Sequence, residues 1–292
     1  MSTRPYLSVV LPSNKNSEQI CKTLFTLVDP TLDDVEYLID LDGVDDHIHD
    51  RIRSMGIKNL FISNYSGKIS HVLNQLIANA RGVFIARADD DDLYAPSRLR
   101  MQAEYLESRT DIHVVGSAIY LAQDGAIIGK KMYPSSHDEI CIAGLFANNI
   151  FAHPVVMGRA EFFKENPYKD APSEDFELWA RGIQRGYRYA NLEVPLMTYN
   201  LGSHSPEAMH GRILATAKTV LWMLNHIFLV EPDMALKLTS ILSTHVHCDI
   251  GQQEQRECLG WFAERLGQLG YGNRILRDVT QRYQPALLAL MN

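Results

Sequence analysis

Hydrophobic and polar positions alternate between two kinds of segment along the first two hundred residues. Short apolar runs rich in β-branched residues predict strands, and longer runs with apolar residues three or four positions apart predict helices. The predicted strands are residues 6–11, 35–41, 60–62, 83–86 and 112–121, and the helices between them are residues 17–28, 68–80 and 98–106. This alternation predicts an α/β fold with a mostly parallel sheet that helices cover on both faces.

The pattern changes after residue 125. Residues 151–157 and 192–199 have the pattern of strands, and residues 174–185 have that of a helix. From residue 206 the chain is helical almost to its end, with breaks near Pro232, Gly251 and Gly270. We therefore expect an α/β domain over residues 1–203 and a helical region over residues 204–292. That region would pack on the first domain, mediate homo-oligomerisation or help to bind a substrate.

Composition and charge restrict the class of protein. The 292 residues are 46% hydrophobic and 22% charged, which is usual for a globular protein. A formal net charge of -7 argues against nonspecific binding to nucleic acid. The chain starts without a signal-peptide pattern, and its longest apolar run, residues 219–230, is too short to span a bilayer. We expect a cytoplasmic protein, with peripheral contact to the inner face of a membrane as an alternative.

Four consecutive aspartates, residues 89–92, follow the apolar run at residues 82–86. Neighbouring carboxylates repel one another, so solvent or a bound cation must offset their charge. They come directly after a predicted strand, and ligands of open α/β sheets bind at the carboxyl ends of strands. The run predicts a divalent-metal site that holds a phosphate-bearing substrate. The alternative is a solvated acidic turn before the helix that Pro96 begins.

Two other predicted strands also end in polar residues. The first is followed by Pro12, Ser13 and Asn14, and the second ends at Asp42 and Gly43. The carboxyl ends of parallel strands meet at the same edge of a sheet, so a ligand at this edge would meet all three segments. It would contact backbone amides, a carboxylate and a metal ion.

These segments, taken in order, resemble the family 2 glycosyltransferases. Residues 12–14 resemble the family's Pro-(Thr/Ser)-x-Asn turn, with the Asn one place early. Residues 41–44 resemble its Asp-Asp-Gly-Ser motif, with Leu and Val in place of the first Asp and the Ser. Residues 73–92 follow its Asn…Ala-x-Gly-x-x-Ile-Ala-x-x-Asp-x-Asp-Asp block. Residues 153–157 and 173–179 resemble its His-x-x-Val-Met and Glu-Asp-x-x-Leu-Trp segments. The resemblance covers about the first two hundred residues.

The resemblance implies a GT-A fold, which is a Rossmann-like nucleotide-sugar-binding sheet flanked by helices. It implies the inverting transfer of a sugar from a nucleoside-diphosphate sugar, with UDP as the expected nucleotide. The expected acceptor is a hydroxyl of a saccharide or a lipid-linked glycan in surface polysaccharide or glycoconjugate synthesis. The implied cofactor is Mn²⁺ or Mg²⁺.

The resemblance also implies roles for particular residues. Asp175 matches the general base and Asp91 the metal ligand. The donor-binding residues that it implies are Pro12, Ser13, Asn14, Asp42, Lys68, Asp89 and Asp90, and those on the acceptor side are His153, Glu174 and Trp179. Structural alternatives exist for several of them: helix N-terminal charge for Glu174 and Asp175, core packing for His153 and Trp179, and a solvated side chain for Lys68.

One segment supports a different class of enzyme. Residues 38–44 match the first motif of the haloacid-dehalogenase-type phosphatases, in which Asp40 would be the nucleophile and Asp42 the acid/base, with Mg²⁺ held by the acidic run. That motif normally lies on the first strand, whereas here another predicted strand precedes it. The phosphatase interpretation also leaves residues 153–157 and 173–179 without a role. A catalytically inactive sugar-nucleotide-binding protein is the third alternative.

Overall fold

The computed structural model describes residues 5–15, 17–29, 31–146, 150–202, 206–243, 250–272, 274–283 and 285–291. The chain divides into two compact units, each built from three segments that alternate along the sequence. The first unit consists of Met1–Tyr133, Phe151–Asp170 and Arg188–Ser203, and the second of Pro134–Ile150, Ala171–Tyr187 and His204–Asn292.

The second unit differs from the C-terminal region that the sequence predicts. The expected boundary after residue 203 lies outside the described residues, and two earlier segments belong with the C-terminal helices. They do so because α5 (His137–Gly144) packs on α11 (Ile275–Tyr283), and α7 (Glu174–Gln184) packs on α8 (Pro206–His226). The helical unit therefore includes the acidic residues that begin α7.

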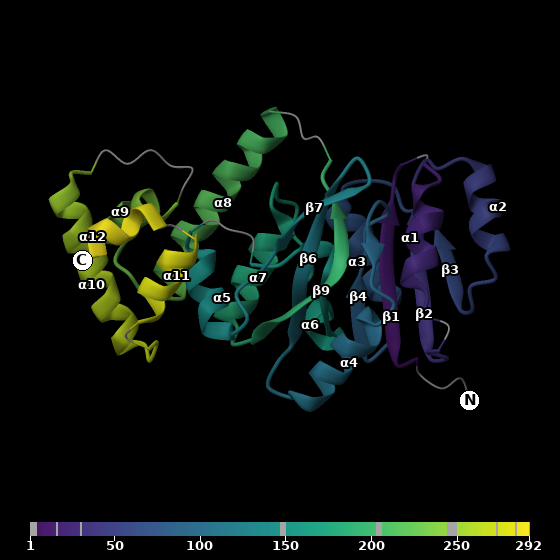
Figure 1. The fold of residues 1–292 in the computed structure, drawn as a ribbon, viewed down its shortest axis with the longest axis horizontal. Coiled ribbons are helices and arrows are strands. Elements are labelled where there is room, and N and C mark those ends of the chain that lie inside the picture. Colours follow the sequence, from purple (N-terminus) through teal and green to yellow (C-terminus); the bar gives the residue numbers. More distant parts are fainter. Residues whose placement is uncertain are drawn as a thin grey trace. The chain divides into compact units, whose positions relative to one another are not determined.

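A mixed sheet forms the centre of the first unit. Within the described part of the chain its strand order is β3-β2-β1-β4-β8-β6-β9-β5, with β7 paired to β6 (Figure 1). The strands are β1 (Leu7–Ser13), β2 (Val35–Leu41), β3 (Leu60–Ser63), β4 (Phe84–Arg87), β5 (Leu93–Tyr94), β6 (Val114–Gln123), β7 (Ala126–Lys131), β8 (Met157–Arg159) and β9 (Tyr189–Asn200). The first four are parallel, as the sequence predicts. β8 is antiparallel to both β4 and β6, so the sheet as a whole is mixed.

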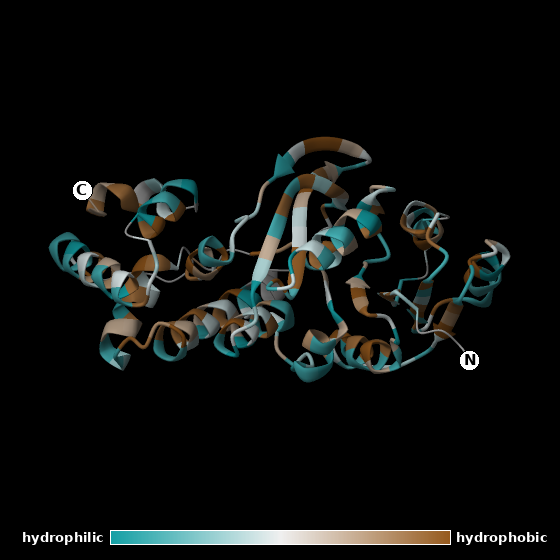
Figure 2. Cartoon of the chain, turned by 90° about the horizontal axis from the view of Figure 1, so that it is seen from below, coloured by the Kyte–Doolittle hydropathy of each residue, from teal (hydrophilic) through white to brown (hydrophobic). Residues whose placement is uncertain are grey.

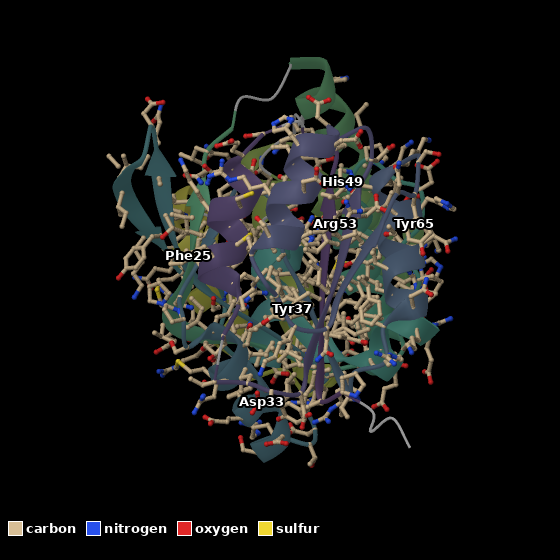
Figure 3. All side chains as sticks on the ribbon, turned by 90° about the vertical axis from the view of Figure 1, so that its right-hand side faces the viewer. Phe25, Asp33, Tyr37, His49, Arg53 and Tyr65 are labelled. Atoms are coloured by element: carbon tan, nitrogen blue, oxygen red, sulfur yellow. The ribbon has the colours of Figure 1, made fainter. Side chains whose placement is uncertain are left out.

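Helices connect the strands of this unit. They are α1 (Gln19–Leu27), α2 (Asp46–Ser54), α3 (Ile69–Asn79), α4 (Arg98–Ser108) and α6 (Ala160–Glu165). Figure 3 shows α1 and α2 side by side, and the labelled Phe25 of α1 is 80% exposed. The sequence pattern did not predict α2, because only Ile48 and Ile52 among its nine residues are apolar.

The expected strand at residues 151–157 is wrong over most of its length. His153–Val155 is a 3₁₀ turn, and the strand β8 begins only at Met157. Pro154 lies within this turn, where its fixed φ suits the first helical position and its missing N–H breaks no ladder. The apolar character of the segment reflects burial, since Val155, Val156 and Met157 are all fully buried.

A glycine allows the close approach of β1 to the segment before β4. A Cβ built on Gly82 would lie 2.5 Å from the backbone nitrogen of Ser8 and 2.7 Å from its hydroxyl. The backbone N–H of Gly82 donates to that hydroxyl at 2.8 Å. Any larger residue at position 82 would push β1 away from the segment that leads into β4 and the acidic residues.

The second unit is helical. It contains α5, α7, α8, α9 (Pro232–Leu242), α10 (Gln252–Gln268), α11, a 3₁₀ turn at Pro285–Leu287 and α12 (Leu288–Met291). Hydrophobic and hydrophilic bands alternate along these helices in Figure 2, and the buried side chains of the unit include Trp179, Phe228 and Phe262. Across the described residues, the helices all fall short of the length and apolar character that a bilayer span requires.

Candidate active site

The carboxyl ends of three strands meet at one edge of the sheet. In the parallel registers Pro12 lies opposite Asp40, Ser13 opposite Leu41, and Val10 opposite Arg87. Backbone hydrogen bonds continue past the strand ends: one joins the residue 42 N–H to the residue 13 carbonyl, and another joins the residue 88 N–H to the residue 10 carbonyl, both at 2.9 Å. The chain reverses its direction of winding between β1 and β4, which is where sheets of this kind bind ligands.

The acidic loop, residues 89–92, is held by partners from distant elements. The buried hydroxyl of Thr23, in α1, lies 2.9 Å from the carbonyl oxygen of Asp90 and 2.8 Å from that of Asp92. At the end of β9, the backbone N–H of Asn200 donates to Oδ1 of Asp92 at 3.0 Å, and its side-chain amide donates to the carbonyl of Asp91. The loop conformation thus depends on two elements that are far from it in sequence.

Three of the four carboxylates converge. Oxygen atoms of Asp89, Asp91 and Asp92 all lie within 4.8 Å of one another. Oδ2 of Asp92 is buried and has no hydrogen-bond partner among the described residues. Burial, together with the charge of Asp89, raises the pKa of Asp92 to about 8. Such a set of hard oxygen donors with an unsatisfied buried carboxylate fits a divalent cation such as Mg²⁺ or Mn²⁺.

Asp90 lies in the same loop but faces the end of β1. Its Oδ2 accepts a hydrogen bond of 2.5 Å from the Ser13 hydroxyl, and its Oδ1 lies 3.3 Å from Nζ of Lys15. Burial raises the pKa of Asp90, and both partners oppose that rise. Two residues that the sequence assigned to donor binding, Ser13 and Asp90, are therefore bonded to each other.

Two cations neutralise the loop. The buried guanidinium of Arg87 pairs with Asp89, and the ammonium of Lys15 lies 2.5 Å from Oδ2 of Asp91. Burial lowers the pKa of Arg87, but the Asp89 carboxylate more than offsets this effect and raises it. The sequence pattern assigned no role to Lys15, and it included Asp92 only as the last member of the acidic run, without a role of its own. The available signals were their positions, directly after Asn14 and at the end of the acidic run.

The remaining donor-side residues lie around these strand ends in different settings. Pro12 is buried in β1, Asn14 is exposed just beyond it, and Asp42 is partly buried. Gly43, which follows Asp42, has a φ of 67°, and this left-handed turn ends the second strand. Lys68 is exposed and lies 2.5 Å from a carboxylate oxygen of Asp170, so the structure gives it a partner away from the acidic loop.

His153 is paired within the first unit. Its Nε2 lies 2.8 Å from the hydroxyl of Tyr168, and both backbone N–H and carbonyl of Tyr168 bond to the Asn74 side chain at 2.8 and 2.9 Å. Burial lowers the pKa of His153 well below its ordinary value, and the charge of Arg87 lowers it further. The ring is therefore neutral near pH 7. Its role on the acceptor side stays a prediction.

Asp175 and Glu174 begin helix α7, in the second unit. Oδ1 of Asp175 accepts a hydrogen bond from the N–H of Phe176 at 2.8 Å, and the hydroxyl of Ser173 lies 3.4 Å from that of Thr216 in α8. Trp179 is only 2% exposed and packs in the interior of this unit. The structure therefore gives no support to Trp179 as a surface for a sugar.

The geometry of Asp40 bears on the phosphatase alternative. Asp40 is 1% exposed, and its Oδ1 accepts hydrogen bonds from the Ser63 hydroxyl at 2.8 Å and the Tyr65 N–H at 2.7 Å. A carboxylate nucleophile must reach its substrate, and this one is enclosed. Its strand, β2, also comes after β1 in the same sheet. Both observations favour the glycosyltransferase interpretation.

Comparison with protein families and curated proteins gives one consistent class. The family model described as "Glycosyl transferase family 2" matches residues 8–166. An O-antigen biosynthesis glycosyltransferase of Escherichia coli, WbnJ, is 28% identical over 214 residues, which are 69% of this chain and 82% of that protein. An uncharacterized glycosyltransferase of Methanocaldococcus jannaschii is 26% identical over 68% of this chain and 71% of its own length. The putative glycosyltransferase EpsE of Bacillus subtilis is 30% identical, but this match spans only about half of each chain, 51% and 52%.

Solved structures agree on the fold. Residues 1–349 of Staphylococcus aureus TarS, in complex with UDP-GlcNAc, superpose with a TM-score of 0.62 at 16% identity, over 96% of this chain and 92% of that one. Over a longer TarS chain the match spans 49% of its length. A Pyrobaculum calidifontis mannosyltransferase in complex with GDP-Man and Mn²⁺ gives a TM-score of 0.56 at 14% identity, over 99% and 84% of the two chains. These likenesses confirm the GT-A fold that the sequence predicts.

Proposed function

Because this chain belongs to glycosyl transferase family 2, we propose that it transfers a sugar, with inversion, from a UDP-sugar to a hydroxyl of a saccharide or lipid-linked glycan. The observation that carries this proposal is the group of Asp89, Asp91 and Asp92, whose oxygens lie within 4.8 Å of one another beside the ends of β1 and β4. A diphosphate needs cationic charge, which a metal ion held by these aspartates would supply, and open α/β sheets bind nucleotides at this edge.

The names of related proteins support the choice of donor and acceptor. A relative from Escherichia coli, 23% identical over 219 residues, is named UDP-Glc:alpha-D-GlcNAc-diphosphoundecaprenol beta-1,3-glucosyltransferase. The E. coli relative WbnJ is named for O-antigen biosynthesis, and the TarS structure holds UDP-GlcNAc. We take UDP as the nucleotide and a glycan on a lipid diphosphate as the acceptor class.

The ends of the strands would bind the nucleoside. The Asp42 carboxylate accepts a hydrogen bond from a base N–H, and Pro12, Ser13 and Asn14 line the same pocket. Asp89, held by the buried Arg87, faces the ribose side. Asp90 acts by fixing the Ser13 hydroxyl, to which it is bonded at 2.5 Å.

Asp91 is the principal metal ligand of this proposal, and Asp92 is the second. Asp91 is 39% exposed and so accessible to an ion, whereas Asp92 is buried and rigidly held by Asn200. A bound Mn²⁺ or Mg²⁺ would supply Lewis-acid stabilisation of the negative charge on the leaving diphosphate. Lys68, exposed and paired with Asp170, is the remaining donor-side residue of this proposal.

Asp175 is the proposed general base. Its carboxylate takes the proton from the acceptor hydroxyl as that oxygen attacks the anomeric carbon from the face opposite the leaving group, and a single displacement of this kind inverts the configuration. A carboxylate is basic enough, because the hydroxyl proton becomes acidic only as the new bond forms. Glu174 and His153 are assigned to the acceptor side.

A screen of nucleotide sugars tests the proposal. Thermal stability and slow donor hydrolysis are measured with UDP-, GDP- and dTDP-sugars, each with Mn²⁺ and with EDTA. We expect a UDP-sugar to raise the melting temperature only when Mn²⁺ is present, because a ligand that binds the native state stabilises it. Stabilisation by a GDP- or dTDP-sugar alone would contradict the choice of base, and the lack of any response to every donor would contradict donor binding itself.

A further inference from the structure

Lys15 lies just beyond the end of β1 and pairs with two carboxylates of the acidic loop. Its ammonium is 2.5 Å from Oδ2 of Asp91 and 3.3 Å from Oδ1 of Asp90. The Lys15 side chain is 54% exposed, and that of Asp91 is 39% exposed. The pair is therefore open to solvent on one side, and an ion that approaches the loop from solvent meets it first.

The second cation of the loop, Arg87, is in the opposite situation. Its side chain is 6% exposed, and it pairs with Asp89. A buried charge that loses its partner is strongly destabilised, so this pair stays formed. An exposed ion pair contributes little and a lysine stem is flexible, so the pair between Lys15 and Asp91 exchanges readily. The loop thus has one fixed cation and one that can leave.

Asp91 belongs to both arrangements. It pairs with Lys15, and its carboxylate is also one of the three whose oxygens lie within 4.8 Å of one another. An ammonium and a divalent ion therefore compete for the same carboxylate. The divalent ion brings twice the charge and reaches Asp89 and Asp92 as well, so it displaces the ammonium from Asp91.

We propose that Lys15 is a displaceable cation of the metal site. It neutralises Asp90 and Asp91 while no divalent ion is bound, gives up Asp91 when the ion binds, and then contacts the diphosphate of the donor. The last step follows from position, since the ammonium starts 2.5 Å from a metal ligand and a metal-bound diphosphate brings negative charge to that place. This inference rests on the proposed donor class, and its first part needs only the metal.

Calorimetric titration of Mn²⁺ into the EDTA-stripped full chain tests the first part. Lys15→Met should bind Mn²⁺ alone roughly two- to five-fold more tightly than the wild type, since it removes a competitor that is paired as weakly as exposed ions usually are. Lys58→Met is the matched control: Lys58 also pairs with an aspartate, Asp33, at 3.3 Å, and both side chains are more than 80% exposed. Its affinity for Mn²⁺ should not change.

Titration of UDP at saturating Mn²⁺ tests the second part. Lys15→Met should bind UDP about ten-fold more weakly, because a hydrogen bond between charged groups is lost. Lys15→Arg keeps the charge and should stay close to the wild type. The two effects of Lys15→Met have opposite signs, whereas a purely structural role for Lys15 would weaken the binding of both ligands.

Two results separate the failure of this inference from that of the proposed function. If wild-type Mn²⁺ binding depends on Asp91 but Lys15→Met binds Mn²⁺ no more tightly, Lys15 is not a competitor and the inference is overturned alone. If the wild type does not bind Mn²⁺ at all, both are overturned. Unchanged UDP affinity in Lys15→Met would remove the diphosphate contact and overturn the second part.

Discussion

The acidic loop of the first unit and the acidic start of α7 in the second unit carry the same kind of side chain, but their hydrogen-bond partners differ. The loop is held by Thr23 and Asn200, which belong to elements far away in sequence. At the start of α7, the hydrogen bond that Oδ1 of Asp175 accepts comes from the very next residue. The loop carboxylates are positioned by elements far away in sequence, and Asp175 takes one of its hydrogen bonds from its own helix.

This difference suits the two tasks proposed for them. Carboxylates that share an ion must stay close to one another in spite of their repulsion, so their backbone needs external support. A general base acts alone on one proton and needs access more than support. Substitutions should therefore affect turnover alone at α7, and ligand binding and stability at the loop.

The largest effect is expected at Asp175. Asp175→Asn keeps the shape and the acceptor of the Phe176 N–H while it removes the basicity. Turnover of the donor identified by the screen should fall on the order of 10²–10⁴-fold, with UDP affinity nearly unchanged. Asp233→Asn, an acidic residue in the first turn of α9, is the control for a general effect of helix charge. Full turnover in Asp175→Asn would contradict the assignment of the general base, because the start of α7 would then have no chemical role.

Asp91→Asn should act on binding. It removes the exposed metal ligand, and the affinity for UDP in the presence of Mn²⁺ should fall at least about ten-fold, or about 1.4 kcal/mol. Calorimetry with and without Mn²⁺ measures this change, and Asp33→Asn, an exposed aspartate paired with Lys58, serves as the control. An affinity that keeps its full dependence on Mn²⁺ would remove Asp91 from the metal site.

Thr23→Val tests the support of the loop itself. The isosteric change leaves the carbonyls of Asp90 and Asp92 without their buried donor, which should lower the free energy of unfolding by about 1–3 kcal/mol. Thr239→Val removes a buried hydroxyl that bonds the carbonyl of Ala235 at 2.8 Å within a helix of the second unit. Urea denaturation measures the free energy of unfolding of both variants. Titration with UDP in the presence of Mn²⁺ measures their affinity for UDP. A loss of stability without any loss of UDP affinity in Thr23→Val would show that loop support and ligand binding are independent.

Asp92→Asn should increase the stability of the metal-free protein. Burial raises the pKa of Asp92 to about 8, above that of the unfolded chain, so the folded protein holds a proton that the unfolded chain has lost. Stability of the metal-free protein therefore falls as pH rises from about 4 to about 8, and a neutral amide removes this loss. We expect a higher free energy of unfolding than that of the wild type at pH 7.5 and a flatter pH profile between pH 5 and 8 in EDTA. A pH profile equal to that of the wild type would contradict the raised pKa of Asp92.

Much of the first unit could be predicted from the sequence, because its strands are buried runs with local signals. The strand predicted at residues 35–41 is β2. The tips after β1, β2 and β4 do meet, since a parallel sheet leaves them no other edge. The order of the segments along the chain also identified the family.

Contacts between distant residues escaped the sequence analysis. The orientation of Asp90 toward Ser13, away from its three neighbours, depends on the position of α1 and on Lys15. The strand expected around Pro154 failed because burial alone produced its apolar pattern. Helix α5 has the capping box of Ser136 and Glu139 as a local signal, but its place in the second unit comes from its packing on α11.

Because the segments of the two units alternate along the chain, neither unit can be removed by a single truncation. A truncation after residue 203 would keep α5 and α7 but remove α8 and α11, on which they pack. Buried side chains of α7, among them Phe176, Leu178 and Trp179, would then face water. The central sheet is therefore not a continuous part of the chain, and chimaeras of this protein have to exchange the three helical segments together.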